Sequence, residues 1–282
     1  MIRKIINTLL FTLFYFSGFS VLLPSDSSGI KENIFPYAIK RNLDYSTAGF
    51  CMATNAVARF VLEPQKPTLS VADISNLKTS DIYFGIDVSA TNQKSIAALD
   101  WSNAIGIGLP LVPAIAIPML AKRRNMWTLY TMYVEAFAVN LGINEIVKDA
   151  VNRPRPLLYN PNYSLAFKME NGNDNLKSFY SEHTSNAFMA AVFLSKVYAD
   201  LGGKHKKLIT ALTLTTAASV GYLRYASGKH FPTDLITGAI IGSGIGYLIP
   251  VLHKQSEKNK NISMLPVFYN SMATGIYFCY RF

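Results

Sequence analysis

An uninterrupted run without charged residues, from Trp101 to Ala121, limits the folds that this chain can adopt. The run contains IGIGLPLVPAIAIPML, and about 20 apolar residues are needed to cross the hydrocarbon core of a bilayer. A core helix of a soluble protein usually keeps a polar face, which this run lacks. The run therefore predicts a transmembrane helix, in which neighbouring helices make its prolines tolerable.

Other apolar segments predict further helices. The last of them contains Gly238, Gly242 and Gly246, small residues that would let a neighbouring helix approach closely. Charged residues also occur inside several of the others, for example Arg59 and Glu135. The segments are Asp44–Val61, Met126–Val147, Asn186–Leu201, Leu208–Tyr225 and Leu235–Leu252.

The two ends of the chain differ from this apolar middle. Residues 1–23 begin with basic residues and continue as an apolar run, as in a signal peptide or an uncleaved N-terminal anchor. We expect residues 24–100 to form an N-terminal helix and a polar exoplasmic segment, and residues 101–252 to form the helical core. Aromatic and turn residues in the tail predict a short β-hairpin, which with a basic linker makes up residues 253–282.

The charge composition narrows the set of partners. A net charge of +10 suits nucleic acid, anionic lipid or an anionic substrate. The positive residues cluster in short loops beside apolar runs without a nucleic-acid-binding motif, so we expect no nucleic-acid partner. The two cysteines, Cys51 and Cys279, have no zinc-type spacing, and we predict neither a metal site nor a cofactor.

Basic clusters at alternate helix ends predict an orientation in a bacterial-type inner membrane. Lys122–Arg124, Lys204–Lys207 and His253–Lys260 form these clusters, and positively charged loops usually stay in the cytoplasm. The opposite helix ends then face the periplasm. This alternation requires that one of the segments 5–23 and 44–61 is cleaved or lies flat on the membrane.

Three polar stretches interrupt the apolar pattern at the ends of the predicted helices. They are KDAVNRPRP (Lys148–Pro156), FYSEHTSNAF (Phe179–Phe188) and LRYASGKHFPTD (Leu223–Asp234). Polar side chains can converge at such junctions without burying an unpaired charge. Together they supply three cations, two histidines and one well-placed acid, a combination that suits a dianionic group such as phosphate.

The histidines admit both a chemical and a structural interpretation. Asp234 would lie one turn into the last helix, within reach of His230, where its carboxylate could fix the imidazole tautomer and leave the other nitrogen as a nucleophile. The same pair could instead simply cap the helix. Ser181 is a suitable N-cap, and His183 in the following turn could protonate a departing oxygen or be a solvated histidine.

The cations also have structural alternatives. Lys148, in a last helical turn, could stabilise the helix dipole, and this is the only role that we expect of Arg153. Arg155 would curl back from the following turn. Arg224 lies inside an apolar helix, where an arginine is costly without an anionic partner.

The combined spacing resembles the type 2 phosphatidic acid phosphatase (PAP2) superfamily, which shares its site with the vanadium haloperoxidases. The first family motif is similar to Lys148-x6-Arg155-Pro156. The second, P-S-G-H, is similar to Tyr180–His183, and the third, S-R-x5-H-x3-D, to Leu223–Asp234. The resemblance implies an all-α fold, a largely transmembrane six-helix bundle, and phosphomonoester hydrolysis without a metal.

The resemblance also implies residue roles. His230 would attack phosphorus and form a phosphohistidine, Asp234 would orient it, and His183 would protonate the leaving oxygen and then activate water. The phosphate-binding positions that the motifs imply are Lys148, Arg155, Ser181, Glu182 and Arg224.

This sequence departs from the family pattern at three positions. Glu182 stands where the family has Gly, Tyr180 replaces Pro, and Leu223 replaces Ser. A carboxylate beside a phosphate would repel it, although Glu182 could point to solvent and favour the helix dipole. The remaining motif residues are intact, so we expect activity.

We therefore expect an integral-membrane lipid phosphatase whose substrate is a lipid phosphate. The resemblance suggests phosphatidic acid, phosphatidylglycerol phosphate, a polyprenyl diphosphate or a phosphate on lipid A. Two alternatives stay open. One is a soluble periplasmic acid phosphatase or haloperoxidase of the same fold, and the other is a lipid-phosphate-binding protein that lost turnover through Glu182.

Overall fold

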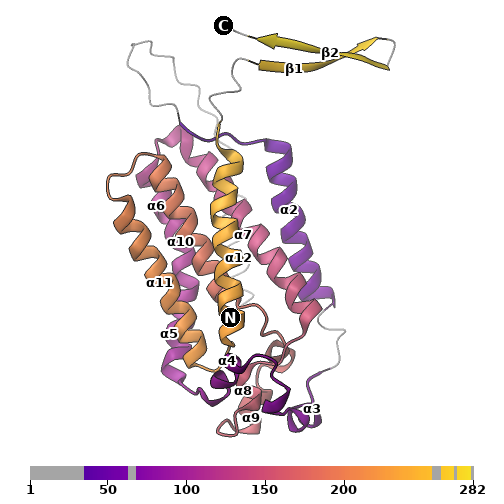
Figure 1. The fold of residues 1–282 in the computed structure, drawn as a ribbon, viewed down its shortest axis with the longest axis vertical. Helices are drawn as coiled ribbons and strands as arrows, with labels where there is room; N and C mark the ends of the chain where they lie inside the picture. The colour runs from indigo at the N-terminus through magenta and orange to yellow at the C-terminus, as the bar shows by residue number, and fades with distance from the viewer. Residues whose placement is uncertain (1–34, 63–67, 256–261, 270–271, 281–282) are drawn as a thin grey trace. The chain divides into compact units, whose positions relative to one another are not determined.

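The chain is predominantly helical in the computed structural model, which describes residues 35–62, 68–255, 262–269 and 272–280 (Figure 1). The predicted signal peptide or anchor, residues 1–23, lies outside these residues. The helices are α2 (Arg41–Val57), α3 (Val71–Asn76), α4 (Gly85–Val88), α5 (Ile96–Gly108), α6 (Val112–Leu120), α7 (Arg123–Val151), α8 (Pro156–Tyr159), α9 (Leu165–Met169), α10 (Glu182–Asp200), α11 (Lys206–Ala226) and α12 (Pro232–His253).

The uncharged run that limits the fold forms most of one continuous helical segment. A 3₁₀ turn, Leu109–Leu111, joins α5 to α6, at the place where Pro110 and Pro113 remove backbone donors. Two helical segments in the described residues, Ile96–Leu120 and Pro232–His253, are long and apolar enough to cross a membrane.

Long helices pack side by side along their length, with α10 against α7, α11 and α12, and α2 against α7 (Figure 1). The N-terminal helix begins a few residues earlier than expected and continues through a π-helical turn, Ala58–Leu62. Fully buried apolar side chains from α7 and α10 fill the centre of this packing. These are Leu129, Met132, Met189, Phe193 and Val197.

The predicted close approach to α12 is confirmed. A Cβ atom at Gly242 would lie 2.1 Å from the carbonyl oxygen of Ser185, and one at Gly246 would lie 2.4 Å from that of Met189. Both carbonyls belong to α10, so the backbones of α10 and α12 touch at these glycines. This contact places the N-terminal ends of both helices, which carry His183 and Asp234, next to each other.

We expect Gly242→Ala to lower the free energy of unfolding by about 1–3 kcal/mol, because the added methyl group must push backbone apart. Gly244→Ala is the matched control, since a Cβ at Gly244 meets nothing within 4 Å. Alanine favours helix over glycine by about 0.5–1 kcal/mol, so this control should be neutral or slightly stabilising. Chemical unfolding in detergent measures both, and equal effects would contradict the close contact.

Short elements cover the end of the packed helices where the polar stretches meet. The sequence shows no apolar periodicity in residues 157–180, yet this connection contains α8, α9 and a 3₁₀ segment, Gly172–Leu176. Buried apolar residues hold it against α3 and the residues just before α3, namely Leu69, Ile74, Leu157, Leu158 and Tyr163. Near the C-terminus, β1 (Ile262–Tyr269) and β2 (Met272–Tyr280) pair antiparallel.

Candidate active site

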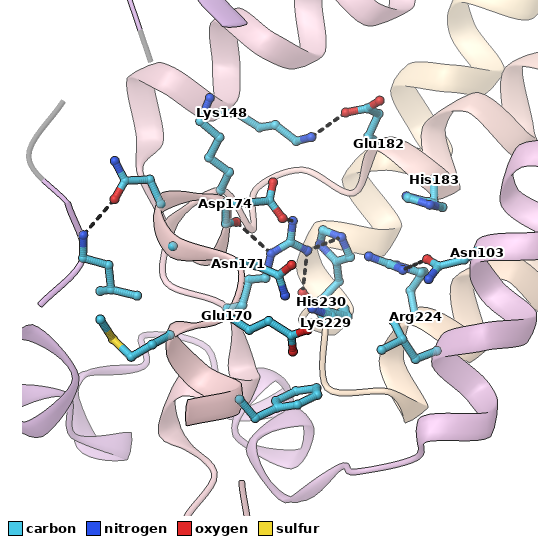
Figure 2. A pocket seen from close by; sticks show the side chains of 18 of the residues that line it. Asn103, Lys148, Glu170, Asn171, Asp174, Glu182, His183, Arg224, Lys229 and His230 are labelled. Atoms are coloured by element: carbon cyan, nitrogen blue, oxygen red, sulfur yellow. Dashed lines mark hydrogen bonds and ion pairs between the residues drawn. The ribbon is translucent and has the colours of Figure 1, made fainter. Parts of the chain in front are cut away.

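A cavity of about 1210 Å³ opens where the C-terminal ends of α7 and α11 meet the start of α10 (Figure 2). Most of the residues that the sequence motifs point to line this one cavity: Lys148, Arg155, Glu182, His183, Arg224 and His230. Ser181 and Asp234 do not line it. Both are fully buried, and they contact residues next to the cavity.

His230 sits in the short turn between α11 and α12, with only 2% of its surface exposed. Its Nδ1 lies 2.8 Å from the carbonyl oxygen of Ser178, and its Nε2 lies 3.1 Å from Nη1 of Arg155. A carbonyl can only accept a hydrogen bond and a guanidinium can only donate one. The two contacts therefore fix the neutral tautomer with its proton on Nδ1 and an unprotonated Nε2.

Electrostatics favour the same neutral state of His230. Burial lowers the pKa of His230 well below its ordinary value, and the nearby charges of Arg155, Arg224 and Lys148 lower it further. Nε2 of the imidazole therefore stays unprotonated at neutral pH, with its electron pair directed at Arg155. This nitrogen belongs to a cavity-lining residue.

The tautomer of His230 does not rest on Asp234 as the sequence suggested. Oδ2 of Asp234 is 3.7 Å from Nδ1, farther than the Ser178 carbonyl. The same oxygen accepts hydrogen bonds from the Ser178 hydroxyl at 2.5 Å and the Phe231 backbone N–H at 2.9 Å. Asp234 thus contacts the two chain segments that flank His230 rather than the imidazole itself.

The helix-end interpretation of Arg153 is wrong. α7 ends at Val151, and the Arg153 guanidinium turns back to bridge two fully buried carboxylates. Nη1 lies 2.6 Å from Asp234 and Nη2 lies 2.7 Å from Asp87, while the guanidinium stacks 4.0 Å from the ring centroid of Phe231. Two buried carboxylates need such a counter-charge, so Arg153 supports the His230 turn.

The cavity cations have different partners. Arg155 pairs with Asp174 at 2.9 Å. Arg224 has no carboxylate partner in the described part of the chain and instead contacts the neutral side chains of Asn103, at 2.9 Å, and Ser102. We expected Arg224 to have an anionic partner, but the neutral Asn103 amide and Ser102 hydroxyl take that place. Among the described residues, no carboxylate is paired with the Arg224 charge beside the cavity.

Glu182 does not point to solvent, contrary to the expectation from its place in the first helical turn. Its Oε2 lies 2.6 Å from Nζ of Lys148 and 3.0 Å from Nη2 of Arg59, and its side chain is only 21% exposed. Arg59 also contacts Glu145 at 3.3 Å. The carboxylate that replaces the motif glycine thus brings a cation from the N-terminal helix to the cavity.

His183 and Ser181 occupy the first turn of α10. The predicted N-cap is confirmed, because the Ser181 hydroxyl accepts a hydrogen bond from the Thr184 backbone N–H. The His183 ring packs against α5, where a Cβ at Gly106 would come within 2.5 Å of its Cδ2. Gly106 therefore makes room for the ring at the cavity wall, across from His230 (Figure 2).

Lys229 lines the cavity, although the sequence motifs did not predict it as a site residue. It is 7% exposed and lines the cavity beside His230. Its ammonium makes no ion pair with any residue that the structure describes, and its nearest aromatic contact is the Phe167 ring at 6.0 Å. Burial and the charges of Arg155 and Arg224 lower the pKa of Lys229 to about 8. Its position directly before the motif histidine was the available signal.

Comparison with known proteins gives the family. A model of the PAP2 superfamily matches residues 129–258. Lipid A 4'-phosphatase of Bacteroides thetaiotaomicron is 27% identical over 163 residues, which cover 55% of this chain and 70% of that protein. Phosphatidylglycerophosphatase B of Bacillus subtilis is 29% identical over 145 residues, which cover 50% of this chain and 65% of that protein.

A crystal structure of a transmembrane PAP2-type phosphatidylglycerolphosphate phosphatase from Bacillus subtilis aligns with a TM-score of 0.44 and 18% identity. The alignment covers 74% of this chain and 94% of that one. The family match spans both histidines and the three motif cations that line the cavity. Residues 129–258 therefore match the PAP2 superfamily, and this match together with the named relatives identifies the chain as a phosphatase.

Proposed function

We propose that this chain is a membrane lipid phosphatase that hydrolyses a lipid phosphomonoester or diphosphate through a phosphohistidine on His230. The observation that carries the proposal is the convergence of a neutral, buried histidine with three motif cations on one cavity. The related proteins named above act on lipid A or phosphatidylglycerophosphate, which supports a lipid phosphate as the substrate.

In the proposed first step, Nε2 of His230 attacks phosphorus while the bond from phosphorus to the lipid oxygen breaks. Burial and the charge of Arg224 lower the pKa of His183 to about 3, so His183 takes up a proton together with the phosphate dianion and then gives this proton to that oxygen. In the second step His183 takes a proton from water, the resulting nucleophile attacks the phosphohistidine, and inorganic phosphate leaves. Arg155, Lys148 and Arg224 neutralise the phosphoryl oxygens throughout, so the chemistry itself needs no metal.

We assign the remaining polar residues by what they touch. Ser181 keeps its hydroxyl within the first turn of α10, so it supports the phosphate site through the helix end rather than by direct contact. Glu182 competes with phosphate for Lys148. Lys229 adds a further cation to the phosphate site, because it is buried at the cavity and unpaired among the described residues.

We further propose that the helical core spans the membrane as six helical segments, with the cavity on the periplasmic side. Large apolar side chains face outward on the two most apolar segments, for example Met119, Ile240 and Leu252, which are 85%, 67% and 68% exposed. Lys122, Lys204 and Lys254 lie at the helix ends remote from the cavity, as the positive-inside rule requires.

This orientation can be read from cysteine labelling in intact cells. With Cys51 and Cys279 replaced by serine, a membrane-impermeant reagent should label Asn162→Cys at the cavity end and spare Lys204→Cys. Because α2 starts at the end that carries the basic residues, the segment before α2 would then be cytoplasmic. The opposite labelling pattern would reverse the proposed orientation.

The activity is tested by phosphate release from a panel of lipid phosphates by membranes that carry the protein, with EDTA present. We expect release by the wild type and by His205→Gln, which changes an exposed histidine remote from the cavity. Loss of release in EDTA, restored by Mg²⁺ in the assay, would contradict this mechanism.

Lys229 should set the alkaline limit of activity. Lys229 is cationic below its pKa of about 8 and loses its charge as the pH rises through that value. We therefore expect kcat/KM of the wild type to fall above about pH 8. Lys229→Met should lower kcat/KM by roughly tenfold at pH 7 and remove this fall, whereas Lys229→Arg should move it to higher pH. Identical profiles in all three proteins would exclude Lys229 from phosphate binding.

Substitutions of Glu182 distinguish an active enzyme from a lipid-phosphate-binding protein that has lost turnover. Removing a carboxylate 2.6 Å from the Lys148 ammonium should free this cation for phosphate. We expect Glu182→Gln and Glu182→Gly to lower KM about fivefold to tenfold, equivalent to about 1 kcal/mol, with kcat nearly unchanged. An inactive wild type that gains strong hydrolysis in Glu182→Gly would favour the binding protein.

A further inference from the structure

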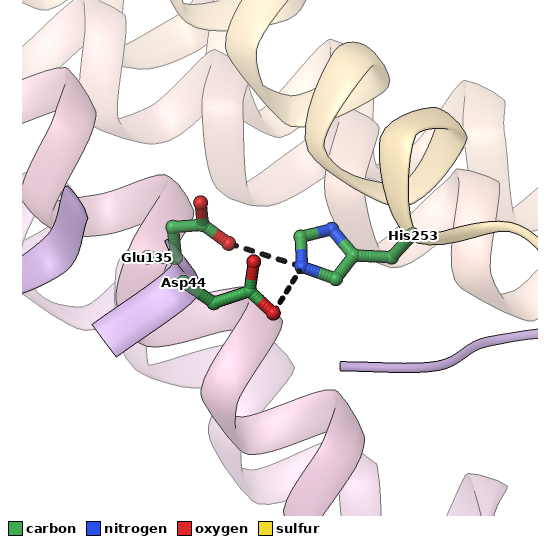
Figure 3. Close-up of side chains that lie close together, drawn as sticks. All are labelled: Asp44, Glu135 and His253. Carbon is green, nitrogen blue, oxygen red and sulfur yellow. Dashed lines mark ion pairs between the residues drawn. The ribbon is translucent and has the colours of Figure 1, made fainter. Parts of the chain in front are cut away.

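A second polar cluster lies inside the packed helices, away from the cavity. It joins three helices through Asp44 of α2, Glu135 of α7 and His253 of α12, which are 3%, 6% and 7% exposed (Figure 3). Nε2 of His253 lies 3.1 Å from Oδ2 of Asp44 and 3.2 Å from Oε2 of Glu135. Lys148 lies thirteen positions after Glu135 in α7, which corresponds to about 20 Å along the helix.

The hydrogen bonding of His253 leaves Nε2 as the atom that faces the carboxylates. Nδ1 lies 2.8 Å from the backbone carbonyl oxygen of Ile249 and must donate to it. Metal-bound histidines usually hold their second nitrogen in this way, which orients the ring and fixes the ligand tautomer. In the neutral ring, Nε2 would direct an electron pair at two carboxylates.

The atoms that face one another are not satisfied by hydrogen bonds. Both His253 Nε2 and Glu135 Oε2 are buried, and neither has a well-formed hydrogen bond to a described residue, although the two atoms lie only 3.2 Å apart. Asp44 Oδ2 does accept one, from the Lys40 backbone N–H at 2.6 Å. The three donor atoms thus converge on a shared point, as ligands of one ion do.

Charge balance points the same way. Two buried carboxylates carry two negative charges, and a protonated His253 would offset only one of them. No lysine or arginine in the described ranges lies within ion-pair distance of Asp44 or Glu135. Burying a net negative charge is costly, whereas a divalent cation with a neutral imidazole would bring the cluster to zero.

From this geometry we propose that Asp44, Glu135 and His253 bind one divalent metal ion of the zinc type, which fastens α2 to α7 and α12. Zinc accepts imidazole nitrogen and carboxylate oxygen at about 2.0–2.2 Å in a tetrahedral arrangement, which places ligand atoms about 3.3 Å apart. The distances from His253 Nε2 to the two carboxylate oxygens are close to this value. The three side chains would fill three of the four positions, and a water molecule would fill the fourth. The ion would stabilise the fold and take no part in phosphoryl transfer.

The test is the metal content of the full-length protein in detergent. The protein is loaded with ZnCl₂, passed over a desalting column, and analysed by inductively coupled plasma mass spectrometry. We expect about one zinc per chain in the wild type and at least about tenfold less in Asp44→Asn and His253→Gln. Asp200→Asn is the matched control, because its carboxylate contacts Tyr37, Lys196 and Lys254 but not the cluster.

Thermal unfolding supplies the second measurement and needs no activity. EDTA should lower the unfolding midpoint of the wild type and of Asp200→Asn, and zinc should restore it. A wild type that retains no stoichiometric zinc and is insensitive to EDTA would overturn the proposal and leave a protonated ion cluster. If the cluster variants fail to fold, the metal content of the wild type and its EDTA response decide alone. Neither result depends on whether the cavity hydrolyses lipid phosphates.

Discussion

His230→Gln is expected to lower phosphate release by at least about 10⁴-fold, equivalent to about 5.5 kcal/mol of activation free energy, while the protein stays folded. The glutamine amide can still donate to the Ser178 carbonyl, which His230 Nδ1 contacts in the wild type, so the turn should persist. What the variant lacks is the unprotonated nitrogen that would form the bond to phosphorus. Phosphate release and circular dichroism, measured together, separate loss of chemistry from loss of fold.

The intermediate itself gives a sharper readout than the rate. Rapid quenching of the wild type with a lipid labelled in its phosphate should trap an acid-labile phosphoprotein. His230→Gln should trap none, and His205→Gln should behave as the wild type does. Substantial turnover by His230→Gln, or a phosphoprotein that forms without His230, would show that another residue is the nucleophile.

Much of the site could be predicted because its residues lie in short stretches at helix ends. Apolar runs located the helices, so the junctions between them located Lys148, His183 and His230. The close helix contact at Gly242 could also be predicted, because small residues at helical spacing usually mark places where two helices pack closely. These features depend on local sequence, which a single chain displays.

Contacts made across long separations in the sequence could not be predicted. Arg59 and Glu135 stand out as charges inside apolar helices, which implies that each has a partner. The local sequence does not show that Arg59 pairs with Glu182. It likewise does not show that Glu135 pairs with His253. Asp87 lies in a polar segment without periodicity, so its burial became visible only in the folded chain.

Arg153 is the residue whose predicted role changes most, and Arg153→Gln is expected to lower the free energy of unfolding by about 3 kcal/mol. Its guanidinium is the counter-charge of Asp87 and Asp234, which are both 0% exposed. Removing one partner of a buried ion pair leaves an uncompensated charge in the interior, a loss of about 3–5 kcal/mol. The lower end applies because the Arg153 side chain is 20% exposed.

A double-mutant cycle with Asp87→Asn tests this assignment. Asp87→Asn removes one of the two carboxylates, so the double variant should be about 1–2 kcal/mol more stable than Arg153→Gln alone. Arg123→Gln is the matched control, because that arginine is exposed at the start of α7 and should change stability by less than about 0.5 kcal/mol. If Arg153→Gln were as mild as Arg123→Gln, Arg153 would be a helix-end cation after all. Asp234 would then hold the His230 turn through Ser178 and Phe231 without its help.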